Sequence, residues 1–123
     1  MELGASVSRR ELARYLSRIS DRWPVERALL GGARVADEQG APPQRERGQE
    51  YVVVLVSPAY EGMPWLERVY QAASLWDALE MGAPADVHCY TPAEFERKLL
   101  TMPSTRQAMD TGLDLLAETA ALS

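Results

Sequence analysis

The sequence predicts an α/β (α+β) fold, in which a small mixed sheet carries helices packed mainly on one face. The continuous apolar run "YVVVLV" at 51–56 is typical of a strand in the interior of a sheet. Amphipathic stretches at 8–23 and 64–81 are typical of helices that pack on such a sheet. These patterns alternate within 123 residues, a length that suits a single domain spanning 1–123.

The first element is a predicted N-terminal helix at 8–23, followed by a core at 24–116. Ser8 and Glu11 have the spacing of a capping box, and Pro24 ends the helix. Its apolar face consists of Leu12, Leu16, Ile19 and Trp23. Its basic stripe, formed by Arg10, Arg14 and Arg18, is either a phosphate or partner contact or a solvated helix face. The second interpretation is favoured, because charged stripes are the normal outer surface of amphipathic helices.

A short strand is predicted at 25–30, and Gly31-Gly32 then allows a tight turn. The segment 33–49 is rich in proline, glycine and charge, which indicates an exposed loop. The strand at 51–56 follows and is expected to be central.

One helix is predicted at 64–81, with Pro64 in its first turn and Gly82 at its C-terminal end. Its expected core face consists of Leu66, Val69, Tyr70, Ala73, Trp76 and Leu79. Trp65 and Trp76 are about three turns apart, so they are expected to share a face and to pack in the core.

A third strand is predicted over "ADVHCYT", and Thr91 to Glu94 is a capping box that opens the next helix. A further short helix ends near Gly112, and "LDLLA" fits either a last strand or a continued helix. The strands on either side of the helix 64–81 are expected to be parallel, whereas the pairing of the first two strands stays open.

Composition excludes several functions. The net charge of −5 argues against broad nucleic-acid binding, which needs a clustered basic surface. No apolar run approaches the ~20 residues needed to span a membrane, and the N-terminus lacks the apolar core of a signal peptide. Cys89 is the only cysteine, which leaves no intrachain disulfide. A cytoplasmic protein is therefore expected.

Alternation along the strands brings candidate ligands to one face. Glu50, Val52 and Val54 share a face of the second strand, and Asp86 and His88 share a face of the third. We expect Glu50 and Asp86 to lie near one sheet edge, beside the Gly31-Gly32 turn. Carboxylates suit Mg²⁺ and backbone N–H groups suit phosphate, so this arrangement would suit a nucleoside triphosphate with its metal.

The motifs "LLGGARV", "EYVV" and "ADV", in this order and followed by "YTPAEF", resemble the minimal nucleotidyltransferase domain of the DNA polymerase β-like superfold. The resemblance covers roughly 23–116. It implies that Gly31 and Gly32 approach the nucleotide phosphates, that Glu50 is the first metal-binding acid and that Asp86 is the third, catalytic acid.

Val52 departs from this pattern, because it stands where the family has its second acid. Valine offers no oxygen to a metal, so the resemblance implies a vestigial site in which Glu50 and Asp86 are left without the bridging ligand. Asp37, Glu38 or Glu46 from the loop 33–49 would be substitutes, a less favoured interpretation. A lone strand histidine such as His88 is more often hydrogen-bonded structure than a ligand or a base.

Three functions follow as hypotheses. The favoured one is a catalytically impaired domain that binds a nucleotide or a protein; small family members often pair with all-helical HEPN-type proteins as toxin–antitoxin modules, and a bacterial setting is expected. The second is an active Mg²⁺-dependent enzyme that moves a nucleotide monophosphate from a nucleoside triphosphate to a protein or small molecule. The third is a structural domain that forms a homo-oligomer.

Overall fold

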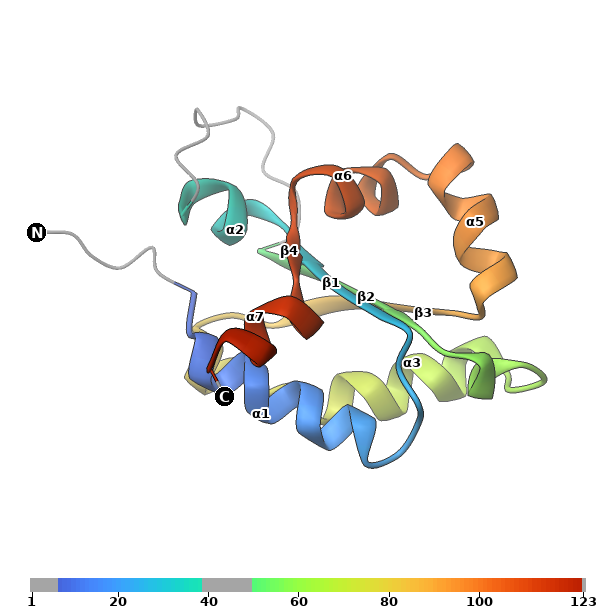
Figure 1. Ribbon diagram of the computed structural model, residues 1–123, viewed down its shortest axis with the longest axis horizontal. Coiled ribbons are helices and arrows are strands. Elements are labelled where there is room, and N and C mark those ends of the chain that lie inside the picture. The colour runs from blue at the N-terminus through green and yellow to red at the C-terminus, as the bar shows by residue number, and fades with distance from the viewer. Residues whose placement is uncertain (1–6, 39–49, 123) are drawn as a thin grey trace, which may run out of the picture.

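The computed structural model describes residues 7–38 and 50–122. A four-stranded mixed sheet confirms the predicted α/β (α+β) class, but helices cover both of its faces, not mainly one as predicted (Figure 1). The strands are β1 (Arg27–Gly31), β2 (Tyr51–Val56), β3 (Ala85–Tyr90) and β4 (Leu113–Asp114). The helices are α1 (Arg9–Ser20), α2 (Ala33–Glu38), α3 (Trp65–Ser74), α4 (Ala78–Met81), α5 (Pro92–Thr101), α6 (Pro103–Thr111) and α7 (Leu115–Leu122), with a 3₁₀ turn at Pro58–Tyr60.

The sheet has the strand order β3-β2-β1-β4. β2 and β3 are parallel, as the intervening helical segment predicts. β1 pairs antiparallel with both β2 and β4, which settles the pairing that the sequence leaves open. The segment "LDLLA", predicted as either a strand or a helix, contains part of both: Leu113 and Asp114 form β4, and α7 starts at Leu115.

Two apolar cores lie on opposite faces of the sheet. The larger core joins α1, α3 and α7 to the face that carries Tyr51, Val53 and Leu55 of β2. The smaller core joins α5 and α6 to the face that carries Val52, Val54 and Val56. All six residues of β2 are therefore buried, which explains why this strand is a continuous apolar run and does not alternate.

The first helix begins as predicted, since the Ser8 hydroxyl accepts a hydrogen bond from the backbone N–H of Glu11. The Glu11 side chain is buried, and its carboxylate accepts from Arg18 at 2.6 Å and from Arg14 at 3.4 Å. Two members of the basic stripe thus neutralise a buried carboxylate, and Arg18 also donates to the carbonyl of Leu75. The predicted apolar face of the helix is buried in the larger core.

The prediction of one helix at 64–81 is wrong. α3 ends at Ser74, and the separate turn α4 begins at Ala78 after Asp77, whose side chain accepts from the backbone N–H groups of Leu79 and Glu80. Between them Trp76 turns into the larger core and donates its indole N–H to the carbonyl of Ala83 at 2.9 Å. An aspartate followed three residues later by a glutamate is itself a helix-start signal, and it marks the break.

The expected core face of this segment is also wrong at most positions, although Trp76 packs against the larger core as expected. Leu66, Tyr70 and Leu79 are exposed by 78%, 76% and 95%. α3 instead turns Arg68 and Ala72 toward the sheet, and the guanidinium of Arg68 is buried. Because the helix is broken, Trp65 and Trp76 do not share a face: Trp76 packs edge-on against Tyr15, whereas Trp65 remains 42% exposed.

The predicted loop at 33–49 is partly wrong as well, because its first six residues form the helix α2. Val35 fills a place in the larger core, which stabilises this short helix although its sequence is otherwise polar. The remainder of that segment, 39–49, lies outside the described residues. Among helices in the described residues, none is both long enough and apolar enough to cross a membrane.

Candidate functional site

Val52, which occupies the position of the family's second acid, lies directly beside Asp86. In the parallel register Val52 pairs with Asp86, Val54 with His88 and Val56 with Tyr90, so these side chains lie on one face as predicted. Val52 is only 7% exposed and belongs to the smaller core, together with Leu29 of β1. The place where the family would have a metal-bridging carboxylate is thus part of an apolar cluster.

A chain of hydrogen bonds runs along the same face of β3. His88 Nε2 lies 3.0 Å from Asp86 Oδ2, and His88 Nδ1 lies 3.1 Å from the hydroxyl of Tyr90. That hydroxyl lies 3.5 Å from Oγ1 of Thr105 on α6. The expectation that His88 is hydrogen-bonded structure is confirmed. Both ring nitrogens of His88 thus have a hydrogen-bond partner within the chain.

The carboxylate of Glu50 forms an ion pair with Arg34 of α2. The Arg34 Nε donates to Glu50 Oε1 at 2.8 Å, and Nη2 donates to the carbonyl of Gly82 at 3.1 Å. The hydrogen bond to Glu50 raises the pKa of the Arg34 guanidinium, which lies over the ring of Tyr51. Since Tyr51 belongs to the larger core, Arg34 lies toward that core, whereas Asp86 binds His88 on the other face.

The Gly31-Gly32 pair has a structural reason to be glycine. Gly32 has φ of 108°, and a Cβ there would lie 2.6 Å from the carbonyl oxygen of Glu50. The chain needs this close approach because Arg34 N–H donates to the same carbonyl at 3.1 Å, which starts α2. Gly31 is less constrained, as its Cβ would meet Ala108 of α6 at 3.4 Å. Ala108 thus packs over the glycine that the resemblance assigns to nucleotide phosphates.

The substitute acids from the predicted loop have other positions. Glu38 accepts from the backbone N–H of Val7 and from Arg9, each at 2.7 Å, and the hydrogen bond from Arg9 lowers the pKa of this carboxyl. Arg9 also binds Glu118, so Glu38 helps to tie α1, α2 and α7 together. Asp37 is exposed on α2, and Glu46 lies outside the described residues.

The residues present do not fit the two-metal group that the resemblance implies. Such a group needs carboxylate oxygens on both sides of the ions, and Val52 supplies none. Glu50 and Asp86 each bind a neighbouring basic or imidazole side chain. Within 7–38 and 50–122, no three histidine, cysteine, aspartate or glutamate side chains form a group that would hold a metal ion.

Sequence reasoning missed Arg34 and Arg68. Arg34 follows the glycine pair, where the family has a polar run. In the sequence, only its charge, opposite to that of Glu50, indicated that the two residues could form an ion pair. Arg68 stands in an amphipathic helix, and nothing in its spacing shows that it is buried against the carbonyls of Met63 and Cys89 and the carboxylate of Glu94.

No protein-family model matches the sequence, and a search of curated proteins finds no significant match. The geometry of β2, β3 and α2 is therefore the basis for assigning a function.

Proposed function

We propose that this chain is a nucleotidyltransferase-like domain that does not transfer nucleotides and acts as a nucleotide- or protein-binding module. The observation that carries the proposal is the pairing of Val52 with Asp86 in the β2–β3 register. The resemblance requires a carboxylate at position 52, and the chain instead has a side chain that is buried in an apolar cluster.

The chemistry of nucleotidyl transfer supports this conclusion. The reaction needs an attacking and a leaving oxygen held by two ions about 3.5–4 Å apart. Loss of one carboxylate that bridges the two ions removes charge stabilisation from the transition state. We expect this loss to raise the activation free energy by about 3–4 kcal/mol or more. Glu50 would also have to share its carboxylate between Arg34 and any metal ion.

The protein-binding part of the proposal has its own support. Leu66 and Tyr70 lie one turn apart on α3 and are both more than three-quarters exposed, with Trp65 beside them. We call these three residues the α3 stripe. An apolar stripe at helical spacing is normally buried, and this one is not buried within the chain. A helical partner of the HEPN type, as the resemblance implies, would present a complementary apolar surface.

The experiment that tests the proposal is a transfer assay with purified protein, Mg²⁺ and each of the four nucleoside triphosphates labelled on the α-phosphate. Acceptors are the chain itself, a co-expressed HEPN-type protein and small alcohols and amines. We expect no labelled product. Mg²⁺-dependent label on any acceptor that disappears in the Asp86→Asn variant would overturn the proposal, whereas label that persists in this variant comes from a contaminant and leaves the expected result unchanged.

The binding part is tested by the same HEPN-type protein in a pull-down. We expect the wild-type chain to retain it and the Leu66→Glu/Tyr70→Glu variant to lose it. Retention by the double variant, or no retention by the wild type together with no calorimetric binding of any nucleoside triphosphate, would contradict the proposed role as a binding module.

A further inference from the structure

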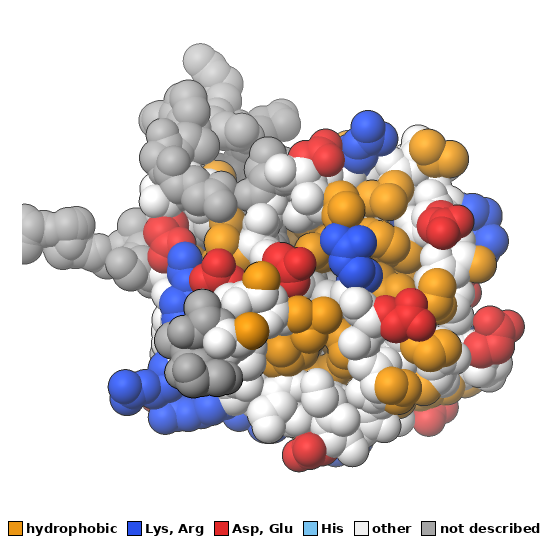
Figure 2. Space-filling model, viewed as in Figure 1, with side chains coloured by type: hydrophobic (Ala, Val, Ile, Leu, Met, Phe, Trp, Pro, Cys, Tyr) orange, Lys and Arg blue, Asp and Glu red, His pale blue; other side chains and the backbone are white. Residues whose placement is uncertain are grey.

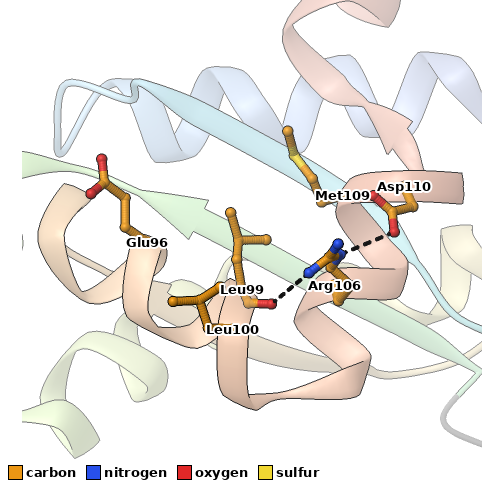
Figure 3. A pocket seen from close by; sticks show the side chains of 6 residues that line it. All are labelled: Glu96, Leu99, Leu100, Arg106, Met109 and Asp110. Carbon is orange, nitrogen blue, oxygen red and sulfur yellow. Dashed lines mark hydrogen bonds and ion pairs between the residues drawn. The ribbon is translucent and has the colours of Figure 1, made fainter.

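An open groove of about 410 Å³ lies between α5 and α6. Six side chains line it, and Figure 3 shows that three come from each helix. They are Glu96, Leu99 and Leu100 of α5, and Arg106, Met109 and Asp110 of α6. Figure 2 shows hydrophobic side chains gathered in this part of the surface with acidic and basic ones among them.

The groove contains both a projecting apolar side chain and a hollow beside it. Leu100 is 82% exposed and projects from the end of α5, which is unusual for a leucine beside other apolar groups. Met109 is 36% exposed, and its sulfur is held by a hydrogen bond from Arg27 Nη2 at 3.1 Å. Leu100 thus projects beside the hollow, and a two-fold interface would place this same patch of each copy against the other.

The charges along α5 are arranged in a definite order. Glu96 lies one turn before Leu100. The guanidinium of Arg106 lies past Leu100, at the C-terminal end of α5, where Nη1 donates to the carbonyl of Leu99 at 3.4 Å. Acid, apolar and basic groups therefore follow one another along the groove, with Glu96 and Leu100 about one helical turn apart and Arg106 beyond Leu100 (Figure 3).

This order is self-complementary under a two-fold axis. If α5 of one copy packs antiparallel on α5 of a second copy with the axis near Leu100, Glu96 of each copy faces Arg106 of the other. The existing ion pair of Arg106 with Asp110 is long, at 3.3 Å, and more than half exposed on both sides, so it is weak. A guanidinium has five donors and serves two carboxylates at once, so Arg106 keeps Asp110 while it binds the second copy.

We propose that the groove between α5 and α6 is a homodimer interface, in which the Leu100 side chains of the two copies meet at the two-fold axis between the grooves and Glu96 of each copy pairs with Arg106 of the other. This interface is independent of the proposed function, since it uses neither β2 and β3 nor the α3 stripe.

A charge exchange tests the interface. Sedimentation equilibrium of the full chain is expected to show a reversible monomer–dimer equilibrium. Glu96→Arg alone and Arg106→Glu alone are each expected to weaken dimerisation about tenfold or more, because like charges then face each other. The double variant restores the pairing with reversed polarity and is expected to dimerise within about threefold of wild type.

The matched control is Arg10→Glu, which makes the same charge change on an exposed residue of α1 outside the groove and leaves the dimer unchanged. Circular dichroism of each variant confirms that it is folded. A monomer at every concentration, or a dimer that both single exchanges leave intact, would overturn the proposal.

A cysteine cross-link tests the position of the axis. Cys89 is fully buried, so a new surface cysteine is the only accessible thiol in the described residues. Leu100→Cys is expected to form a disulfide-linked dimer on mild oxidation, because residues at a two-fold axis approach within the ~4–7 Å Cα separation of a disulfide. Leu79→Cys, on a highly exposed residue of α4 outside the groove, is expected to form no disulfide-linked dimer. Equal cross-linking of the two variants, or none in Leu100→Cys, would overturn the placement.

Discussion

Val52 of β2 pairs directly with Asp86 of β3, so an apolar side chain lies where the resemblance requires a second metal-binding carboxylate. This neighbour relation gives a first prediction. Val52→Asp places a buried charge in the smaller core beside Asp86 and is expected to lower the free energy of unfolding by about 2–4 kcal/mol. Val52→Thr, which adds a hydroxyl without a charge, is expected to cost clearly less. Urea unfolding measures both.

The same variant tests the metal site. Mg²⁺ is expected to give Val52→Asp no stabilisation beyond that of wild type, because Glu50 remains paired with Arg34. A rise in the urea midpoint of Val52→Asp that saturates with Mg²⁺ would show that the remaining ligands still form a site, contrary to the geometry.

The two glycines are predicted to differ in their tolerance of a side chain. Gly32→Ala forces a positive φ on a residue with a Cβ and drives that atom within 2.6 Å of a backbone oxygen, so a loss of at least about 2 kcal/mol is expected. Gly31→Ala meets only an ordinary contact at 3.4 Å and is expected to cost less than about 1 kcal/mol. Thermal or urea unfolding compares them. Equal losses would contradict the role of Gly32 in the close approach of β2.

Arg68 is predicted to be essential for stability although it is charged. Its side chain is 7% exposed and donates to Glu94 at 2.8 Å, and it also binds two backbone carbonyls. Arg68→Met leaves these acceptors unpaired and is expected to cost about 3–5 kcal/mol. Arg106→Met, at a 59% exposed arginine, is expected to cost less than about 0.5 kcal/mol in the monomer. Similar unfolding midpoints for the two variants would show that Arg68 is not buried as described.

The α3 stripe gives a prediction for which the structure and the sequence pattern expect different results, because the pattern places Leu66 in the core and the structure places it at the surface. Leu66→Ala is expected to change the free energy of unfolding by less than about 0.5 kcal/mol, because the side chain is 78% exposed. Leu16→Ala, on the buried face of α1, is expected to cost about 2–5 kcal/mol. A large loss for Leu66→Ala would mean that α3 turns its apolar face toward the sheet after all.

Cys89 is predicted to be unreactive in the folded protein. Burial raises the pKa of its thiol to about 11, so almost none is thiolate at neutral pH. Because the folded pKa is raised, the contribution of the thiol to stability is present below its ordinary pKa and is lost as the pH rises toward 11. Labelling with a chromogenic disulfide is expected to be slow in buffer and complete in denaturant. Rapid labelling of the folded chain would contradict the burial of β3.

Much of the fold was predictable because local patterns agree with it. The caps at Ser8 and Thr91 and the apolar run of β2 each have a mechanism that acts within a few residues. The shared face of Asp86 and His88 on β3 also followed, because side chains alternate along a strand, whereas the register that pairs Val52 with Asp86 did not.

The errors come from contacts between distant residues. Helical spacing identifies the apolar stripe of Leu66 and Tyr70 but not which side of α3 meets the sheet. That choice depends on Arg68, whose long side chain reaches acceptors on β3 and α5. The break after Ser74 likewise depends on Trp76, which packs against Tyr15 of α1 and Tyr51 of β2. The ion pair of Arg34 with Glu50 was missed because the two residues are 16 positions apart, and only the pairing of β1 with β2 brings them together.

The most direct test of the central claim is a crystal of the wild-type chain soaked with Mn²⁺ and a non-hydrolysable nucleoside triphosphate, with anomalous data collected for manganese. We expect no anomalous peak between Glu50 and Asp86, Val52 in its apolar cluster and the Arg34–Glu50 ion pair intact. A manganese peak coordinated by both Glu50 and Asp86, with the triphosphate bound to it, would contradict the claim that this strand pair no longer forms a metal site.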